Sequence, residues 1–349
     1  MPDTLVAIVP VHNGGRDVHA CLSALREASL DGSCIVVVDD ASTDGAAREA
    51  AERYGCGYLM SACTDAQIAS GAPDGPSSPG PQGPARARNR GAAWASASPL
   101  GATLLLFVDA DVTVHADAVT RFRRVFSEQP GLAAAFGSYD DEPSDRGWIS
   151  RYKNLLHHRM HQGPPRPAST FWSGCGAVRT TVFERFGGFD ERYTGATIED
   201  IEFGMRLHAA GETIALRPDI LCTHHKRWTL RGWLRTDILG RALPWSRLLV
   251  ERAGKLPDTL NVSRRERLTA AIVCSMPVCV LLVMLGTVPT LASIGFAASL
   301  AAFLWLQRDL LAFFARRGGT GFALAAGAMH IAYYLYSSLT FALVRLRLV

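Results

Sequence analysis

The eight cysteines of this 349-residue sequence form no CxxC pair and no spacing typical of a zinc site. Two of them, Cys274 and Cys279, lie in a strongly apolar stretch near the C-terminus. The pattern excludes a zinc ribbon and the disulfide framework of a small secreted domain. We therefore expect reduced cysteines that act as packing residues.

The N-terminus lacks the basic segment and the long apolar run of a signal peptide. Residues 1–5 carry no basic side chain, and the apolar run after them is short. This pattern predicts that the front domain stays in the cytoplasm.

Charge is missing from most of the C-terminal tail. Residues 268–307 contain no Asp, Glu, Lys, Arg or His, and in residues 318–344 only His330 can be protonated near neutral pH. One crossing needs about 20 apolar residues, so the first stretch can cross a membrane twice and the second once. A buried hairpin in a soluble core is the alternative, although soluble helices of this length usually have a polar face. We expect a multi-pass protein of the cell membrane, with crossings at about 268–286, 288–306 and 322–344.

Positive charge gathers immediately before this tail. Residues 226–267 contain 11 Lys or Arg against 4 Asp or Glu, with Trp228, Trp233 and Trp245 among them. Basic residues mixed with apolar ones indicate amphipathic helices lying on an anionic membrane surface. Nucleic acid is the other partner that such a segment can bind, but the segment leads directly into the predicted crossings, so we expect no nucleic acid partner.

The first 225 residues predict an α/β domain. Short β-branched runs at 4–9 and 34–38 are typical of buried parallel strands, and residues 17–29 between them place apolar side chains at helical spacing. The alternation continues to residue 137, and sheets of this kind bind ligands at the carboxyl ends of their strands. Residues 70–84, rich in Pro, Gly and Ser, are expected to form a flexible surface loop in this domain rather than a linker, because strands resume beyond them.

An apolar strand predicted at 104–108 ends in two carboxylates, Asp109 and Asp111. At a strand end this spacing lets both carboxylates reach one hard cation, directly or through water, and the cation can bridge a nucleotide diphosphate. The pattern alone is weak, because acidic pairs at strand ends also occur as helix caps and solvated turns.

Three further motifs accompany this DxD pair: IVPVHN at 8–13, VVVDDASTDG at 36–45 and GPARARNRG at 83–91. With FVDADV at 107–112 they stand in the order found in the family 2 glycosyltransferases, which the chain resembles over roughly residues 4–230. The resemblance implies a GT-A fold (a Rossmann-like domain that binds nucleotide-diphospho-sugars), a Mg²⁺ or Mn²⁺ cofactor and a UDP- or GDP-sugar donor. It also implies a relationship to dolichol- and polyprenyl-phosphate sugar transferases and, more distantly, to cellulose and hyaluronan synthases.

The resemblance also implies which residues bind the donor. Pro10, His12 and Val38 line the base and ribose pocket, Asp40 accepts from the nucleobase, and Asp109, Ala110 and Asp111 hold ribose, diphosphate and metal. A carboxylate suits the N–H groups on a uracil or guanine edge, although Asp40 can equally be a simple turn residue. Arg88 is either a further nucleotide contact or a solvated arginine in the first turn of a helix.

Residues 172–179 and 187–191 (GGFDE) resemble the family's acceptor side, and residues 198–207 resemble its ED motif at a helix start. Asp200 is the candidate general base. A carboxylate beside the donor can take the proton of an acceptor hydroxyl that attacks the anomeric carbon from behind, and this attack inverts that carbon. Glu199 is expected on the same acceptor and diphosphate side. The alternative is that both acids only favour the helix dipole.

Residues 222–228 (CTHHKRW) lie where processive family members carry QxxRW. His224 stands in place of the glutamine, so the match is partial and processive synthesis is in doubt. His224 is a candidate third metal ligand beside Asp109 and Asp111, or a structural residue. Lys226 and Arg227 can neutralise phosphate, and Trp228 ends the motif on the acceptor and diphosphate side.

The leading hypothesis is inverting sugar transfer from a nucleotide sugar to a lipid-linked or other membrane-embedded hydroxyl or phosphate at the cytoplasmic face. A processive polysaccharide synthase is a second hypothesis, but three crossings offer little material for a pore. An inactive nucleotide-sugar-binding scaffold is a third. The presence of Asp109, Asp111 and Asp200 argues against that scaffold.

Overall fold

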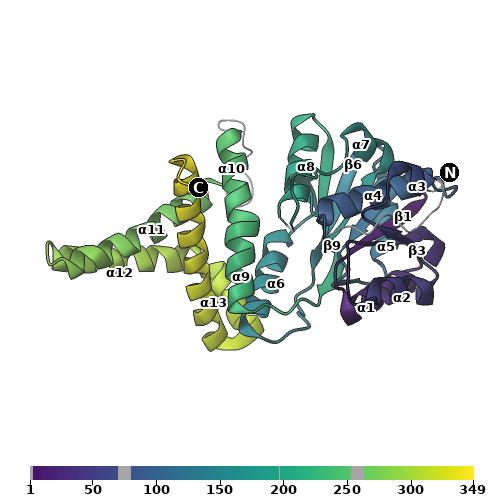
Figure 1. The fold of residues 1–349 in the computed structure, drawn as a ribbon. Helices are drawn as coiled ribbons and strands as arrows, with labels where there is room; N and C mark the ends of the chain where they lie inside the picture. The colour runs from purple at the N-terminus through teal and green to yellow at the C-terminus, as the bar shows by residue number, and fades with distance from the viewer. Residues whose placement is uncertain (1–2, 70–79, 196, 253–262) are drawn as a thin grey trace. The chain divides into compact units, whose positions relative to one another are not determined.

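The computed structural model describes residues 3–69, 80–195, 197–252 and 263–349. The chain divides into two compact units, of which the first comprises Met1–Asp145 with Leu156–Arg227 and the second comprises Arg146–Leu155 with Trp228–Val349. The first unit is α/β and the second is helical (Figure 1). Much of the loop predicted at 70–84 and part of the basic segment at 226–267 lie outside the described residues.

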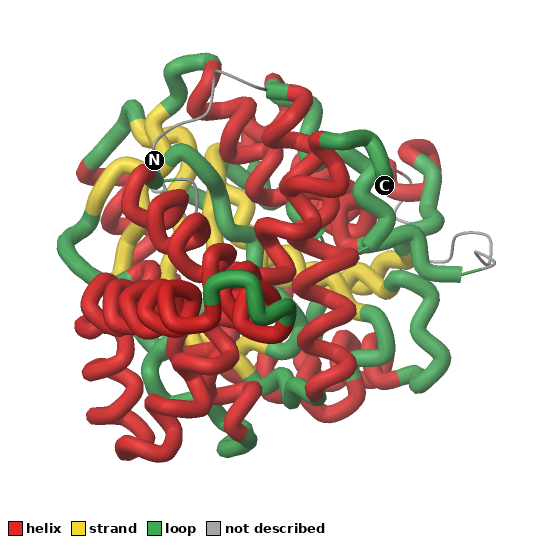
Figure 2. Tube along the Cα trace, turned by 90° about the vertical axis from the view of Figure 1, so that its left-hand side faces the viewer, coloured by secondary structure: helices red, strands yellow, loops and turns green. Residues whose placement is uncertain are grey.

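The strands of the first unit form a single mixed sheet, which is drawn in yellow in Figure 2. Their order is β3-β2-β1-β4-β8-β6-β9-β5, and β7 pairs with β9. The strands are β1 (Leu5–Val11), β2 (Ile35–Asp39), β3 (Gly57–Met60), β4 (Leu104–Val108), β5 (Val112–Val114), β6 (Leu132–Tyr139), β7 (Arg166–Ala168), β8 (Cys175–Arg179) and β9 (Thr213–His224).

Helices cover both faces of this sheet, because alternate side chains of its buried strands point to opposite sides. Leu5, Ala7 and Val9 of β1 pack in one core, whereas Val6 and Ile8 pack in another. The first core includes residues of α1 (Gly15–Glu27), α2 (Ala46–Tyr54) and α5 (Ala118–Glu128), and the second includes residues of α4 (Pro84–Ala97), α7 (Thr180–Arg185) and α8 (Glu199–Ala209). The unit also contains α3 (Asp65–Ala69), the 3₁₀ turn η1 (Gly32–Cys34) and the C-terminal part of α6 (Trp148–His161).

Strand directions bring one end of most strands to the same edge of the sheet. The parallel strands β1, β2 and β4 have their carboxyl ends there. The strand β8 is antiparallel to β4, with Cys175 opposite Val108, so β8 begins at this edge. The strands β6 and β9 end there and β5 begins there, because β6 is antiparallel to β8, β9 is parallel to β6, and β5 is antiparallel to β9. This carboxyl edge is therefore the expected ligand-binding edge.

The second unit consists of helices. They are α9 (Leu230–Arg235), the π-helix η2 (Thr236–Ala242), α10 (Leu243–Glu251), α11 (Arg264–Met284), α12 (Pro289–Leu306) and α13 (Arg308–Arg345), with the N-terminal part of α6. Trp228 and Trp233, predicted to belong to amphipathic surface helices, are only 9% and 3% exposed. Their rings therefore belong to the interior of this unit and not to an exposed apolar face.

Among the described residues, two helices are long and apolar enough to cross a membrane, α11 and α12. They pack against each other as a hairpin in Figure 1. The prediction of an α/β domain followed by helices apolar enough to cross a membrane is thus confirmed. The third predicted crossing, 322–344, lies in α13, which has non-helical backbone at Gly319 (φ +78°). The number and direction of crossings remain predictions.

Candidate active site

Arg88 joins the two acidic motifs at the carboxyl edge. Its Nη2 donates to Oδ1 of Asp109 and its Nη1 donates to Oε1 of Glu199, both at 2.7 Å. The side chain is 5% exposed, and burial alone would lower the pKa of the guanidinium, but Asp109 and Glu199 together raise it above its usual range. Arg88 therefore stays charged and fixes the first aspartate of the DxD pair.

This arrangement bears on two roles predicted from the sequence. Arg88 was expected to contact the nucleotide or to be solvated, yet it is buried and both of its Nη atoms are engaged by carboxylates. Glu199 was expected on the acceptor side, yet it is 4% exposed and is held by Arg88. The physical reason is that a buried guanidinium needs carboxylate partners, and these two residues provide them.

Asp111 and His224 form the second pair at this edge. Antiparallel pairing of β5 with β9 places Val112 opposite His224, and Oδ2 of Asp111 lies 3.5 Å from Nε2 of His224. Burial favours a raised pKa for Asp111, but the hydrogen bond and charge of His224, followed by the charge of Lys226, lower it overall. Asp111 is therefore a carboxylate near neutral pH.

The structure brings together only two of the three predicted metal ligands. In the described part of the chain, no group of three His, Cys, Asp or Glu side chains is arranged to hold a metal ion. Asp109 instead accepts a hydrogen bond from Arg88. A carboxylate oxygen and an imidazole nitrogen are suitable ligands for a divalent cation, so Asp111 and His224 fit a metal whose other ligands come from outside the chain.

Asp200 lies in the first turn of α8, beside Glu199. Its Oδ2 accepts from the peptide N–H of Ser173 (3.0 Å) and from the Ser173 hydroxyl (3.1 Å), and its Oδ1 accepts from the N–H of Ile201 (2.8 Å). Burial and the negative charge of Glu199 raise the pKa of Asp200 to about 6, against these hydrogen bonds and the charge of Arg88. A carboxylate with such a pKa can accept a proton near neutral pH.

The donor-side residues end strands β1 and β2. His12 is exposed and its Nδ1 lies 2.8 Å from the carbonyl oxygen of Asp40, while Pro10 is partly exposed. Asp40 is 4% exposed and accepts from the Ser61 hydroxyl (2.6 Å) and from the peptide N–H groups of Gln82 and Gly83 (2.8 Å each). Its carboxylate thus anchors the backbone just before α4.

Val38, which was predicted to line the base and ribose pocket, lies inside the core. Its side chain is fully buried and packs in the core against α4, where a Cβ on Gly91 would meet it at 3.0 Å. Ala110 is partly buried against the other core. Lys226 and Arg227 are exposed after β9, and Trp228 belongs to the second unit, where its peptide N–H donates to the Ser150 hydroxyl.

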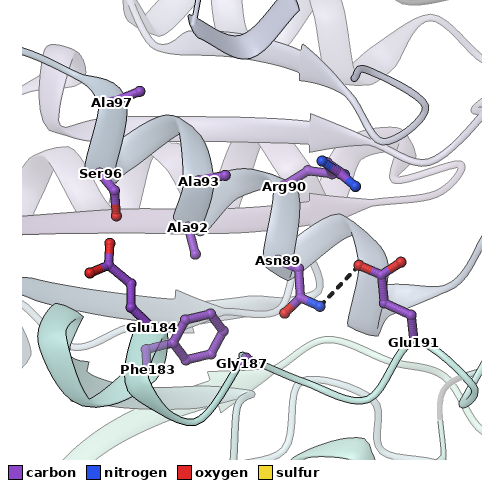
Figure 3. Close-up of a pocket in the computed structure, with 11 residues that line it drawn as sticks. Asn89, Arg90, Ala92, Ala93, Ser96, Ala97, Phe183, Glu184, Gly187 and Glu191 are labelled. Carbon is purple, nitrogen blue, oxygen red and sulfur yellow. Dashed lines mark hydrogen bonds between the residues drawn. The ribbon is translucent and has the colours of Figure 1, made fainter. Parts of the chain in front are cut away.

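A separate hollow of 570 Å³ lies between α4 and α7, lined by Phe183, Glu184 and the Gly187-Gly188 turn (Figure 3). Asn89 donates to Oε1 of Glu191 (3.1 Å), and both glycines have positive φ. The GGFDE turn thus docks on α4. The residues lining this hollow include none of the predicted site residues, so we do not assign catalysis to it.

Sequence analysis missed a cluster of rings at the carboxyl edge, formed by Tyr139, His157, Trp172 and His224. Tyr139 stacks on His224 with ring centroids 4.6 Å apart and planes inclined by 8°. Tyr139 ends β6, Trp172 precedes β8 and His224 ends β9. Because all of those strand ends lie at this edge, their places in the sequence were the available signal that the rings would meet.

The chain matches the protein family model described as glycosyl transferase family group 2 over residues 104–306. A mixed sheet with a split acidic pair after β4 and a carboxylate opening α8 defines a GT-A-type domain. The chain belongs to glycosyl transferase family group 2, as its motifs predicted.

Two relatives come from Mycobacterium tuberculosis. A pre-mycofactocin glycosyltransferase is 25% identical over 236 residues, which cover 66% of this chain and 44% of that protein. An N-acetylglucosaminyl-diphospho-decaprenol L-rhamnosyltransferase is 26% identical over 255 residues, covering 65% of this chain and 77% of that one. The chain thus spans less than half the length of the first relative.

Solved structures of similar fold include the mannosyltransferase PcManGT from Pyrobaculum calidifontis in complex with GDP-Man and Mn²⁺. The TM-score is 0.59 at 19% identity, with 98% of this chain and 89% of that chain covered. S. aureus TarS has a TM-score of 0.51 at 15% identity, with 96% and 55% covered. These likenesses concern the fold alone.

Proposed function

We propose that this protein transfers a sugar from a nucleotide sugar to a lipid-linked or other membrane-embedded acceptor, with inversion at the anomeric carbon. The observation that carries the proposal is that Asp109 and Asp111, which follow β4, and Asp200, at the start of α8, converge on one sheet edge in three different environments. Family membership and the rhamnosyltransferase relative, whose name specifies a decaprenol-linked acceptor, support the same reading.

The donor would bind across the ends of β1, β2 and β4. Asp111 and His224, with Lys226 close by, would hold a divalent cation and the diphosphate there. Mn²⁺ accompanies GDP-Man in PcManGT, which supports this assignment of the donor class and the metal. A bound cation would neutralise charge on the leaving diphosphate.

Within the chain, each carboxylate has its own task. Arg88 holds Asp109 in one orientation through a charge-assisted hydrogen bond. The Asp109 carboxylate would therefore already be oriented when the donor binds. Asp200, oriented by Ser173, would remove the proton of the attacking hydroxyl. The apolar helices α11 and α12 would keep the enzyme at the membrane, with its catalytic unit on the cytoplasmic face.

The proposal is tested with detergent-purified full-length protein and a panel of UDP- and GDP-sugars, with Mn²⁺ or Mg²⁺. Nucleotide release is measured by chromatography with and without total membrane lipid. We expect one donor to be consumed, faster with lipid, and no consumption in excess EDTA. Full activity in EDTA would remove the metal from the mechanism. Consumption of no donor under any condition would favour the inactive scaffold.

A further inference from the structure

Three rings from separate segments meet beside Asp200 at the carboxyl edge, and we call Tyr139, His157 and Trp172 the aromatic platform. Tyr139 and Trp172 meet edge to face with centroids 4.9 Å apart. His157 lies 4.2 Å from Tyr139 and 4.5 Å from Trp172. All three residues are partly buried and partly exposed, so the platform is not enclosed in the core.

The local structure makes room for this platform. A Cβ on Gly174 would lie 2.6 Å from the Trp172 ring, so only glycine permits the indole to lie over that backbone. Tyr139 is braced from another side by the stacked imidazole of His224. The rings are therefore held in place by their surroundings.

The position of the platform separates it from the donor side. The donor-side residues follow β1 and β2, whereas Tyr139 ends β6 and Trp172 precedes β8, which lie beyond β4 in the sheet order. Trp172 is followed directly by Ser173, whose N–H and hydroxyl both bind Asp200. The platform thus adjoins the proposed base and lies on the half of the edge that the donor-side residues leave for an acceptor.

Resting on the proposed function, we propose that the aromatic platform binds the pyranose ring of a glycosylated acceptor, so that the group attacking the donor is a sugar hydroxyl. The C–H groups on one face of a pyranose carry partial positive charge and fit the negative face of an indole or phenol ring. Flat aromatic rings beside a few polar groups are a common lining of small-molecule sites.

The chemistry of Asp200 favours a hydroxyl over a phosphate as the attacking group. A phosphate monoester is already ionised near neutral pH, needs no base and would be repelled by a carboxylate. A sugar hydroxyl, in contrast, needs a base to remove its proton. Its oxygen forms the new bond to the anomeric carbon, its proton passes to Asp200, and the old bond breaks as its electron pair leaves with the nucleotide diphosphate.

The inference is tested by acceptor binding without any donor. Full-length protein is prepared in an amine-oxide detergent, because sugar detergents would occupy the site. Saturation-transfer NMR then measures a panel of octyl glycosides against octyl phosphate. We expect at least one glycoside to bind through its ring protons and octyl phosphate not to displace it. Displacement by octyl phosphate, or binding of octyl phosphate alone, would overturn the inference.

Variants of the platform residues test whether the glycoside binds at the aromatic platform. Trp172→Leu should weaken glycoside binding about tenfold, the size of one lost aromatic contact, and Trp172→Phe should restore most of it. Tyr54→Leu is the matched control, because Tyr54 lies in α2, pairs with His19 and has no place in the site. His157→Leu serves if Trp172→Leu does not fold, as judged by its melting curve. Equal affinity in the platform variants and wild type would contradict the assignment.

This experiment separates the inference from the proposed function. Glycoside binding that depends on Trp172, without consumption of any donor, would uphold the platform and reject the transferase. Donor consumption stimulated by lipid, without glycoside binding, would uphold the transferase and reject the platform.

Discussion

Nη2 of Arg88 lies 2.7 Å from Oδ1 of Asp109, so a buried cation of the protein itself occupies one oxygen of the first DxD aspartate. Asp111, two residues further, turns instead toward His224. The two carboxylates, which look equivalent in the sequence, therefore have different partners. Substitution of each aspartate should therefore impair a different step, metal binding for Asp111 and donor placement for Asp109.

Asp111→Ala should weaken metal affinity, because the cation loses one of the two ligands that the chain brings together. Asp109→Ala should keep a larger share of that affinity and lose activity through misplacement of the donor. Titration of nucleotide release with Mn²⁺ separates the two, since only Asp111→Ala is expected to regain rate at high Mn²⁺. Identical titration curves for both variants would show that both aspartates are ligands.

Arg88→Ala should destabilise the protein by about 3–5 kcal/mol, the usual cost of leaving buried carboxylates without their cation. Glu199 is 4% exposed and would lose the guanidinium that neutralises it. Urea unfolding of the variant measures the effect.

Arg124→Ala is the control for Arg88→Ala. Arg124 forms an exposed pair with Glu128 in α5, and an exposed pair of this spacing contributes only about 0.3–0.5 kcal/mol. Equal stability of the two variants would show that the buried network around Arg88 adds nothing to the fold.

Asp200→Asn should lower the transfer rate by roughly two to four orders of magnitude, the range for a lost general base, with donor affinity little changed. Calorimetry of donor binding and the transfer rate are measured on the same variant. A parallel fall of affinity and rate would make Asp200 a donor-site residue. No change in either would make it only a residue that favours the helix dipole.

The same residue predicts a pH dependence for the wild type. Asp200 is the active base only as a carboxylate, and its pKa is raised to about 6 by burial and by Glu199, against the charge of Arg88. The transfer rate should therefore rise as pH increases through about 6 and level off above it. A rate that is flat from pH 5 to 7 would exclude a base with this pKa.

The membrane model predicts that the protein sediments with membranes and is released by detergent but not by high salt. Arg308, Arg316 and Arg317 should then lie on the cytoplasmic side, by the positive-inside rule. Three crossings place the C-terminus, with Arg345 and Arg347, on the opposite side, which that rule opposes. A C-terminal reporter with cytoplasmic activity would reduce the crossings to an even number.

Sequence patterns were sufficient to predict the α/β domain and the edge of the sheet at which the acidic motifs lie, because these depend on local order. Buried strands are continuous apolar runs, and parallel strands bring the residues after them to one edge. The family motifs added the roles that the resemblance implies for these residues. Burial was harder to predict: Val38 and Arg88 stand in motifs that resemble ligand-binding segments, yet both side chains are buried.

The sequence by itself determined the two regions of the chain, the family and the strand ends at which the acidic residues stand, since each is encoded in short contiguous patterns. Only the tertiary structure decided which carboxylate binds which cation, that Asp40 anchors the backbone before α4, and that three rings gather beside Asp200. These partnerships join residues far apart in the chain. Their formation depends on strand pairing and on the need of each buried charge for a partner, which no local pattern contains.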